Sequence, residues 1–165
     1  MNNKKTTKPA PHKLSLSVQY ASEAQDMPTR PQFRRWIKAA LQRDVRMTLR
    51  IVDEAEGREL NKAYRGKDYA TNVLTFVYDD AGTPPGLPLS GEEMLYGDVI
   101  ICAPVVEKEA AAQHKDLLAH YAHLSIHAAL HLQGYDHEND SDAAEMEALE
   151  TGLMLKLRYH DPYQA

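Results

Sequence analysis

The sequence predicts an α+β fold built as a single domain, with a small mixed sheet of about four strands covered by roughly five or six helices. Two observations carry this prediction. Segments that alternate apolar and polar residues occur in the first two thirds of the chain, whereas apolar residues at helical spacing dominate the last third. The length of 165 residues suits one compact domain, which we expect to span residues 14–163.

The N-terminal region predicts the order strand, helix, strand. Residues 14–19 and 45–51 alternate apolar with polar side chains, as strands with one buried face do. Between them, residues 31–42 place apolar side chains at helical spacing, and Thr29 is the candidate N-cap. We expect the two strands to pair with each other.

The middle of the chain predicts a second helix and two further strands. Asp53 is the candidate N-cap of a helix that continues through Tyr64. Residues 71–78 and 98–103 have the composition of strands. The segment between these strands, residues 79–93, is rich in proline and glycine and predicts a turn-rich surface loop.

Helical patterns fill most of the chain after Pro104. A long apolar helix is predicted over residues 117–132, and Gly134 is the residue that ends it. A last helix is predicted from about Ser141, a favourable N-cap with Glu145 behind it.

Composition indicates an ordinary globular protein. Hydrophobic residues make up 43% and charged residues 26%, and no apolar run approaches the roughly 20 residues of a membrane span. Residues 1–13 carry Lys4, Lys5 and Lys8 without the apolar core of a secretory signal, so we expect a disordered basic tail and a soluble, cytoplasmic protein. Cys102 is the only cysteine and follows apolar neighbours, which predicts a buried, inert strand thiol.

Charge is distributed unevenly along the chain. The formal net charge is −5, yet residues 30–68 contain eleven Lys and Arg against six Asp and Glu, whereas residues 92–150 contain two against thirteen. The cations of the first segment suit a cleft that binds a polyanion, because phosphate contacts need lysine and arginine. A solvated helix surface explains the same charges, so charge alone leaves both interpretations open.

Three histidines have the spacing of a metal site. His127 and His131 are four residues apart, so a helix presents both imidazoles on one face. Gly134 can stop that helix and turn the chain back, which returns His137 to the same position. Three imidazoles without a fourth protein ligand leave a coordination position open, as in catalytic zinc sites. The pattern therefore predicts a hydrolytic centre with one ion at the end of the central helix, with zinc as first choice and nickel, copper or iron also accepted.

Neighbouring groups have more than one interpretation. A lone histidine is more often an ordinary core or surface residue than a ligand, but the combined spacing of these three argues against that explanation here. His123 and His120 lie one and two turns upstream, so we expect them to pack or to support the ligands rather than to bind the ion. Asp136 either orients a ligand imidazole or caps the following helix.

The same spacing occurs in metzincin proteases, whose motif H-E-x-x-H-x-x-G-x-x-H places a glutamate base after the first histidine. Ala128 occupies that position in this chain. A site with the ligands but without the base should not cut peptides by that mechanism, so we disfavour a metalloprotease.

A different likeness is closer. The stretch HAALHLQGYDH resembles the signature of the YbeY family, bacterial single-metal endoribonucleases that act in ribosomal RNA maturation and ribosome quality control. The stretches LNKAYRGKDYATNVLTF, GDVIICAPVVEKEA and AAEMEALETGLMLKLRYHDPY are similar to further family segments, so the resemblance covers roughly residues 14–163. One departure is Ala128, where the family usually has glycine; a helix accepts alanine readily.

The resemblance implies a single-strand-specific, metal-dependent endoribonuclease that acts in rRNA processing, including maturation of the 3′ end of 16S rRNA. It implies RNA as substrate, and the ribosome, small-subunit proteins or assembly factors as partners. A non-catalytic ribosome-assembly or RNA-binding protein with a structural ion is the alternative, which a fourth protein ligand would indicate.

By the same resemblance, His127, His131 and His137 are the ligands, and Arg65 in YRGKD is the functional arginine. A guanidinium can hold two phosphate oxygens and stabilise the charge that phosphodiester hydrolysis builds. Without the resemblance, Arg65 is a surface charge at the end of a helix.

Overall fold

The structure is a computed structural model that describes residues 11–78 and 94–164. Most of the predicted basic tail, residues 1–10, and the predicted loop at residues 79–93 lie outside the described residues. Within the described part, the chain is held from Lys13 onward, because the backbone N–H of Lys13 donates to Asp44 Oδ1 at 2.8 Å.

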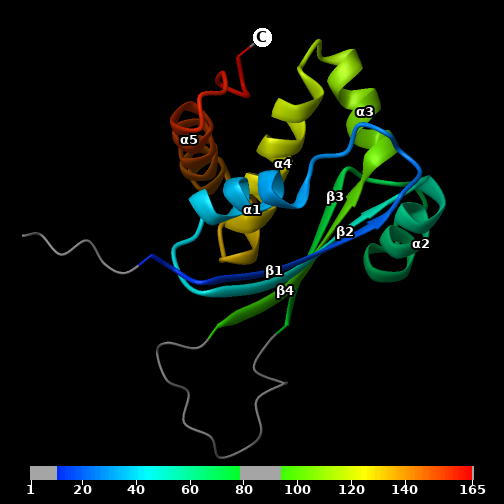
Figure 1. The fold of residues 1–165 in the computed structure, drawn as a ribbon, viewed down its shortest axis with the longest axis horizontal. Coiled ribbons are helices and arrows are strands. Elements are labelled where there is room, and N and C mark those ends of the chain that lie inside the picture. Colours follow the sequence, from blue (N-terminus) through cyan, green and yellow to red (C-terminus); the bar gives the residue numbers. More distant parts are fainter. Residues whose placement is uncertain (1–10, 79–93, 165) are drawn as a thin grey trace, which may run out of the picture.

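A mixed sheet forms the centre of the fold (Figure 1). Its strands are β1 (Leu14–Ala21), β2 (Val45–Val52), β3 (Val73–Tyr78) and β4 (Leu95–Cys102). They lie in the order β1-β2-β4-β3, with β1, β2 and β4 parallel and β3 antiparallel to β4. The predicted pairing of the first two strands is confirmed, in a register that aligns Leu14 with Val45.

Helices account for most of the remaining described residues. They are α1 (Arg30–Ala39), α2 (Glu54–Arg65), α3 (Ala103–Ala112), α4 (Leu117–Leu132) and α5 (Asp140–Lys156). Together with the sheet they confirm the predicted α+β class with one small mixed sheet. Among the described residues, we find no helix with the length and hydropathy that crossing a membrane requires.

The helix caps test the local predictions. Thr29 caps α1 as predicted, with a reciprocal bond in which the Gln32 side chain accepts from the Thr29 backbone N–H. The prediction that Ser141 caps the last helix is wrong, because Asn139 has the extended backbone and its side chain accepts from Asp142 N–H at 2.8 Å. Ser141 therefore lies inside the first turn of α5.

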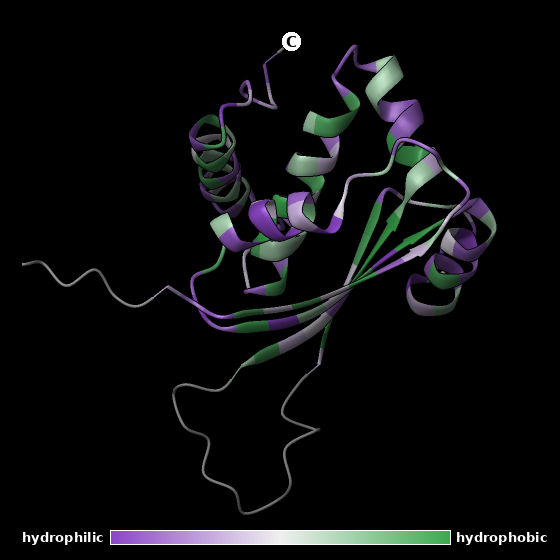
Figure 2. Ribbon diagram, viewed as in Figure 1, coloured by the Kyte–Doolittle hydropathy of each residue, from purple (hydrophilic) through white to green (hydrophobic). Residues whose placement is uncertain are grey.

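One face of the sheet packs against α1 and α4 and forms the core. Alternate residues of β2, from Val45 to Ile51, are buried on this face, and α4 is buried over most of its length. In Figure 2, hydrophobic residues are concentrated in the strands and in α4. Gly97 of β4 lies under the end of α4, where a Cβ atom would come within 2.2 Å of Leu132 Cδ1. The close approach of strand and helix therefore needs a glycine at this position.

Among the described residues, α2 covers the other face of the sheet, near the carboxyl ends of the parallel strands. A Cβ atom on Gly57 of α2 would lie 3.2 Å from Cys102 Sγ, so helix and strand are in close contact there. Arg50 on the same face pairs with Glu56 of α2 at 2.5 Å. Cys102 is buried as predicted, and this burial raises the pKa of its thiol.

Candidate metal centre

The three predicted histidines gather at the C-terminal end of α4. His127 and His131 stack along the helix, with ring planes 2° apart and centroids 6.4 Å apart. Gly134 has a φ of 106° and follows the end of the helix, as its predicted role requires. The turn returns His137 to a position where its ring centroid is 5.7 Å from that of His127 and 6.2 Å from that of His131.

Hydrogen bonds orient the two α4 imidazoles. His131 Nδ1 lies 3.0 Å from the carbonyl oxygen of Tyr135, which can only accept, so Nδ1 carries the proton. His127 Nδ1 lies 2.5 Å from Oε1 of Glu150, and an ionised carboxylate likewise accepts. In both rings the lone pair is left on Nε2. This tautomer and second contact are typical of metal-binding histidines, so the donor set fits a divalent transition metal.

A carboxylate joins the cluster. His131, Asp136 and His137 each offer a ligand atom, and these atoms lie within 4.8 Å of one another. His127 falls outside this tight group although its ring is adjacent. Asp136 does not cap α5, since Asn139 does, and its Oδ1 accepts from the backbone N–H of His137 at 2.7 Å. Asp136 is therefore a further candidate ligand or an orienting group for the returning turn.

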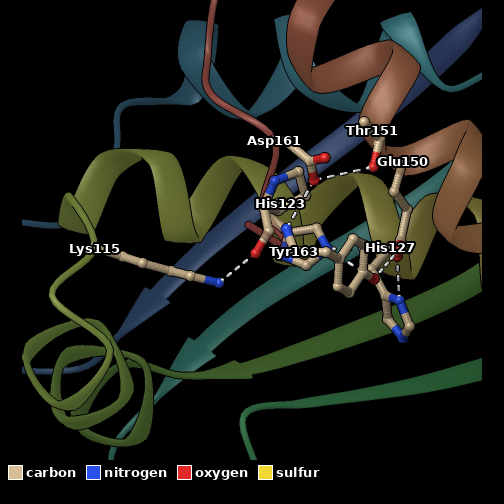
Figure 3. A network of polar contacts seen from close by, with 8 residues as sticks. Lys115, His123, His127, Glu150, Thr151, Asp161 and Tyr163 are labelled. Atoms are coloured by element: carbon tan, nitrogen blue, oxygen red, sulfur yellow. Dashed lines mark hydrogen bonds and ion pairs between the residues drawn. The ribbon is translucent and has the colours of Figure 1, made fainter. Parts of the chain in front are cut away.

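Glu150 of α5 is a buried carboxylate that contacts His127 (Figure 3). Its side chain is 0% exposed, with one oxygen on His127 and the other accepting from the Tyr163 hydroxyl. Burial by itself raises the pKa of this carboxyl, but contacts with two histidines and Tyr163 outweigh it and lower the pKa to about 2. Glu150 is thus ionised and can hold the Nδ1 proton of His127.

Hydrogen bonds of the C-terminal segment, residues 161–163, hold Tyr163 in this network (Figure 3). Lys115 Nζ donates to the carbonyl oxygen of Pro162 at 2.7 Å. The Thr151 hydroxyl lies 3.3 Å from Asp161 Oδ1, which also accepts from the backbone N–H of Tyr163 at 2.9 Å. Contacts with α5 and with the connection between α3 and α4 therefore hold the segment in place.

His123 and His120 continue the polar row along α4. His123 Nε2 lies 3.3 Å from the Tyr163 hydroxyl, and His120 Nε2 lies 3.0 Å from Glu109 Oε1. Burial lowers the pKa of His120, against the opposing effect of Glu109. Both side chains are largely buried, and the His123 ring lies edge-on to the ring of His127, with centroids 6.4 Å apart. His123 and His120 thus pack among buried residues, as expected. A role in supporting the ligands stays a prediction.

A groove of about 310 Å³ leads to this network. Its lining includes Asn72, Val73, Glu109, His120, His123 and His127. The groove therefore lies between α4 and the start of β3 and reaches the candidate metal centre through His127.

Arg65 is exposed at the last residue of α2. Among the described residues, its guanidinium has no hydrogen bond or ion pair. The neighbouring Tyr64 packs edge-on against Phe76 of β3 with centroids 4.9 Å apart, and Phe76 points to the sheet face opposite α4. The end of α2 that carries Arg65 thus lies beside the edge strand β3. The catalytic role of Arg65 stays a prediction.

Sequence reasoning missed Glu150 and Tyr163. Glu150 had a usable signal, because Met146, Glu150 and Met154 follow one another at intervals of four residues and all three are buried. A carboxylate in the apolar stripe of a helix needs a buried partner. Tyr163 had no comparable signal, since its position depends on how the C-terminal segment folds back.

The fold and this cluster define a class: a single-domain α+β protein with a candidate site for one divalent metal ion. The chain belongs to the YbeY family. The family model, described as Endoribonuclease YbeY, matches residues 17–158.

Curated relatives agree with this assignment. Endoribonuclease YbeY of Nitrosospira multiformis is 54% identical over 94% of this chain and 85% of the relative. Endoribonuclease YbeY of Methylobacillus flagellatus is 53% identical over 93% of this chain and 95% of the relative. The solution structure of TM1509 from Thermotoga maritima is 23% identical with a TM-score of 0.49, over 90% of this chain and 99% of that one.

Proposed function

We propose that this member of the YbeY family is an endoribonuclease in which His127, His131 and His137 hold one divalent metal ion. One observation carries the proposal. The Nδ1 protons of two imidazoles on α4 are bound by Glu150 and by the Tyr135 carbonyl, so the lone pair of each ring is on Nε2 and can bind a metal. His137 returns beside them and completes a set of three nitrogens.

An ion in this site supplies Lewis acidity for phosphodiester hydrolysis. The chain itself contributes the orientation of the donors. Glu150 keeps the proton of His127 on Nδ1 and compensates the positive charge that gathers at the site, because its own charge is buried and fixed. The cluster lies at a groove, so a phosphodiester can approach His127 from solvent.

Arg65 completes the proposal as the group that binds phosphate oxygens. The side chain is exposed and has no competing acidic partner among the described residues, so its guanidinium is available to an anion. A guanidinium on two phosphate oxygens stabilises the charge of the transition state.

The finer assignments follow the family. We propose zinc as the ion, with nickel or another divalent transition metal as substitutes. The proposed substrate is single-stranded RNA, within rRNA processing that includes the 3′ end of 16S rRNA. The proposed partners are the ribosome, small-subunit proteins and assembly factors, in the cytoplasm.

Peptide hydrolysis is the weaker candidate. The residue after His127 is Ala128, which is 1% exposed and offers no carboxylate to serve as base. A purely structural ion would need a fourth protein ligand. Asp136 is the candidate for it among the described residues, but its Oδ1 already accepts from the backbone N–H of His137. Cys102, the only cysteine, lies on the opposite face of the sheet from α4.

The experiment is to incubate the metal-loaded protein with rRNA, a single-stranded RNA and casein, and to separate the products by size. We expect internal cuts in both RNAs and intact casein. Metal-depleted protein, and the same protein with zinc restored, are the matched controls. Cleavage of casein, or RNA cleavage that survives metal depletion, would contradict the proposal.

A further inference from the structure

The sheet face opposite α4 carries exposed aromatic side chains. We refer to residues 46, 78 and 96 and the surface around them as the open face. The register places Arg46 of β2 opposite Tyr96 of β4, and Tyr96 opposite Tyr78 of β3. These three side chains therefore form one row across neighbouring strands. Side chains in such a row point to the same side of the sheet.

The row is open to solvent. Tyr96 is 46% exposed and Tyr78 is 56% exposed, and Tyr64 of α2, beyond Phe76, is 67% exposed. Helix α2 covers only the carboxyl ends of the parallel strands, where Gly57 approaches Cys102. Single exposed apolar residues are ordinary, but adjacent aromatic rings on a sheet indicate a surface that binds something.

A cation beside the aromatic rings of the open face suits a single-stranded nucleic acid. The Arg46 guanidinium lies 5.3 Å from the centroid of the Tyr96 ring and is exposed. Glu56 is paired with Arg50, whereas Asp98 accepts from the neutral Tyr78 hydroxyl and keeps its charge, so Arg46 is the cation of this row that can bind a phosphate. Strand β2 and helix α2 together carry five Lys and Arg against three Glu.

We infer that the open face binds single-stranded RNA, with bases stacked on Tyr96 and Tyr78 and a phosphate near Arg46. Aromatic rings on a sheet stack bases without regard to sequence, and neighbouring cations bind the backbone. Another protein would use the aromatic rings but would gain less from the exposed guanidinium of Arg46 beside them.

The open face and the candidate metal centre are separated by the edge strand β3. Phe76 and Tyr78 point to the open face, whereas Val77, paired with Gly97, points to the side of α4. An RNA strand that lies on the open face can therefore pass round the edge of β3 to reach the histidines. This inference rests on the proposed function, since it assigns a binding surface to the same substrate.

The test measures binding and cleavage separately in the full-length, metal-loaded protein. Fluorescence anisotropy with labelled single-stranded DNA reports binding without cleavage by an endoribonuclease, because stacking does not need the 2′-hydroxyl. The variant combines Tyr96→Ser with Tyr78→Ser, both at exposed positions. We expect its affinity to fall roughly tenfold or more, the scale of losing stacking on one or two bases.

Three further variants sharpen the test. Tyr96→Phe keeps the ring and should bind as the parent does. Arg46→Ala should weaken binding less than the double variant and should reduce its dependence on salt. Leu155→Ser removes an exposed apolar side chain from α5 and serves as the matched control.

Two results would overturn the inference. The first is unchanged affinity of the double variant. The second is a change of mass in light scattering without a change of affinity, which would assign the open face to a second copy of the chain. Loss of binding in variants of a parent that cannot cleave RNA would support the inference and contradict the proposed function, so the two failures are distinguishable.

Discussion

The two faces of the sheet present their functional side chains in opposite ways. On the α4 face, His127 is held by a fully buried carboxylate, and His131 is held by a backbone carbonyl. On the open face, Tyr96 and Tyr78 stand about half exposed on the strands. A metal site needs fixed donors, because coordination distances tolerate little variation. A stacking surface works with adaptable rings, because every base offers a flat face.

Removing a ligand on the α4 face should have the largest effect. We expect His131→Ala to abolish metal retention and RNA cleavage, because one of the oriented Nε2 donors is lost. The strands and other helices do not depend on the ion, so circular dichroism should show an unchanged fold. Metal content after dialysis and RNA cleavage are the measurements. Normal nuclease activity in this variant would contradict the proposed mechanism.

The identity of the third ligand can be decided by a pair of variants. We expect His127→Ala to lose the ion and Asp136→Asn to keep it, because Glu150 orients His127 while Asp136 already accepts from the His137 backbone. Chelator competition measures both affinities. The opposite outcome would assign the third position to Asp136, in line with the tight group that it forms with His131 and His137.

Charge reversal at Arg65, at the end of α2, should have the next largest effect. Arg65→Glu should lower turnover about a hundredfold or more, the scale of losing one donor that stabilises transition-state charge. Melting temperature and bound metal should change little, since Arg65 is exposed and has no partner among the described residues. Steady-state cleavage of single-stranded RNA is the measurement.

Two substitutions control the Arg65 experiment. Arg65→Lys should restore only part of the activity, because an ammonium cannot hold two phosphate oxygens in one plane. Lys38→Glu reverses an exposed charge in the last turn of α1 and should leave turnover near the parent value. Cleavage by Arg65→Glu at the normal rate would refute the role carried over from the family. Lys62, Lys67 and Arg50 would then be the next phosphate-binding candidates.

Loss of the buried carboxylate that contacts His127 should weaken metal binding without abolishing it. We expect Glu150→Gln to weaken metal binding roughly 10- to 100-fold, as loss of a partner of a ligand histidine does. Competition with a chelating dye measures this affinity directly. Glu147→Gln changes an exposed residue of the same helix and should have no effect. Equal affinities for the two variants would show that Glu150 serves packing alone.

The contact between sheet and α4 should give the smallest effect, on stability. A Cβ atom at Gly97 would lie 2.2 Å from Leu132 Cδ1 and 2.9 Å from the Phe76 carbonyl oxygen. Gly97→Ala should therefore lower the free energy of unfolding by about 1–3 kcal/mol, measured with urea. Gly152→Ala is the control, because a Cβ atom there meets nothing within 4 Å and the residue lies inside α5. It should stabilise the protein by about 0.5–1 kcal/mol.

Local patterns in the sequence determined the helices, the strands and the spacing of the candidate ligands. The alternation of residues 45–51, the cap at Thr29 and the stop at Gly134 depend on neighbours within one or two turns. The last cap was predicted at Ser141 instead of Asn139, because serine, asparagine and aspartate compete at that site and local sequence does not rank them.

Only the tertiary structure decided what surrounds those ligands. The strand order β1-β2-β4-β3, the position of α2 and the meeting of Glu150 with His127 join segments that are distant along the chain. Tyr163 reaches Glu150 because the C-terminal segment folds back. Periodicity specifies which side of an element is buried, but not which element covers it. A hydrogen bond between two elements exists only once their packing has brought donor and acceptor within reach.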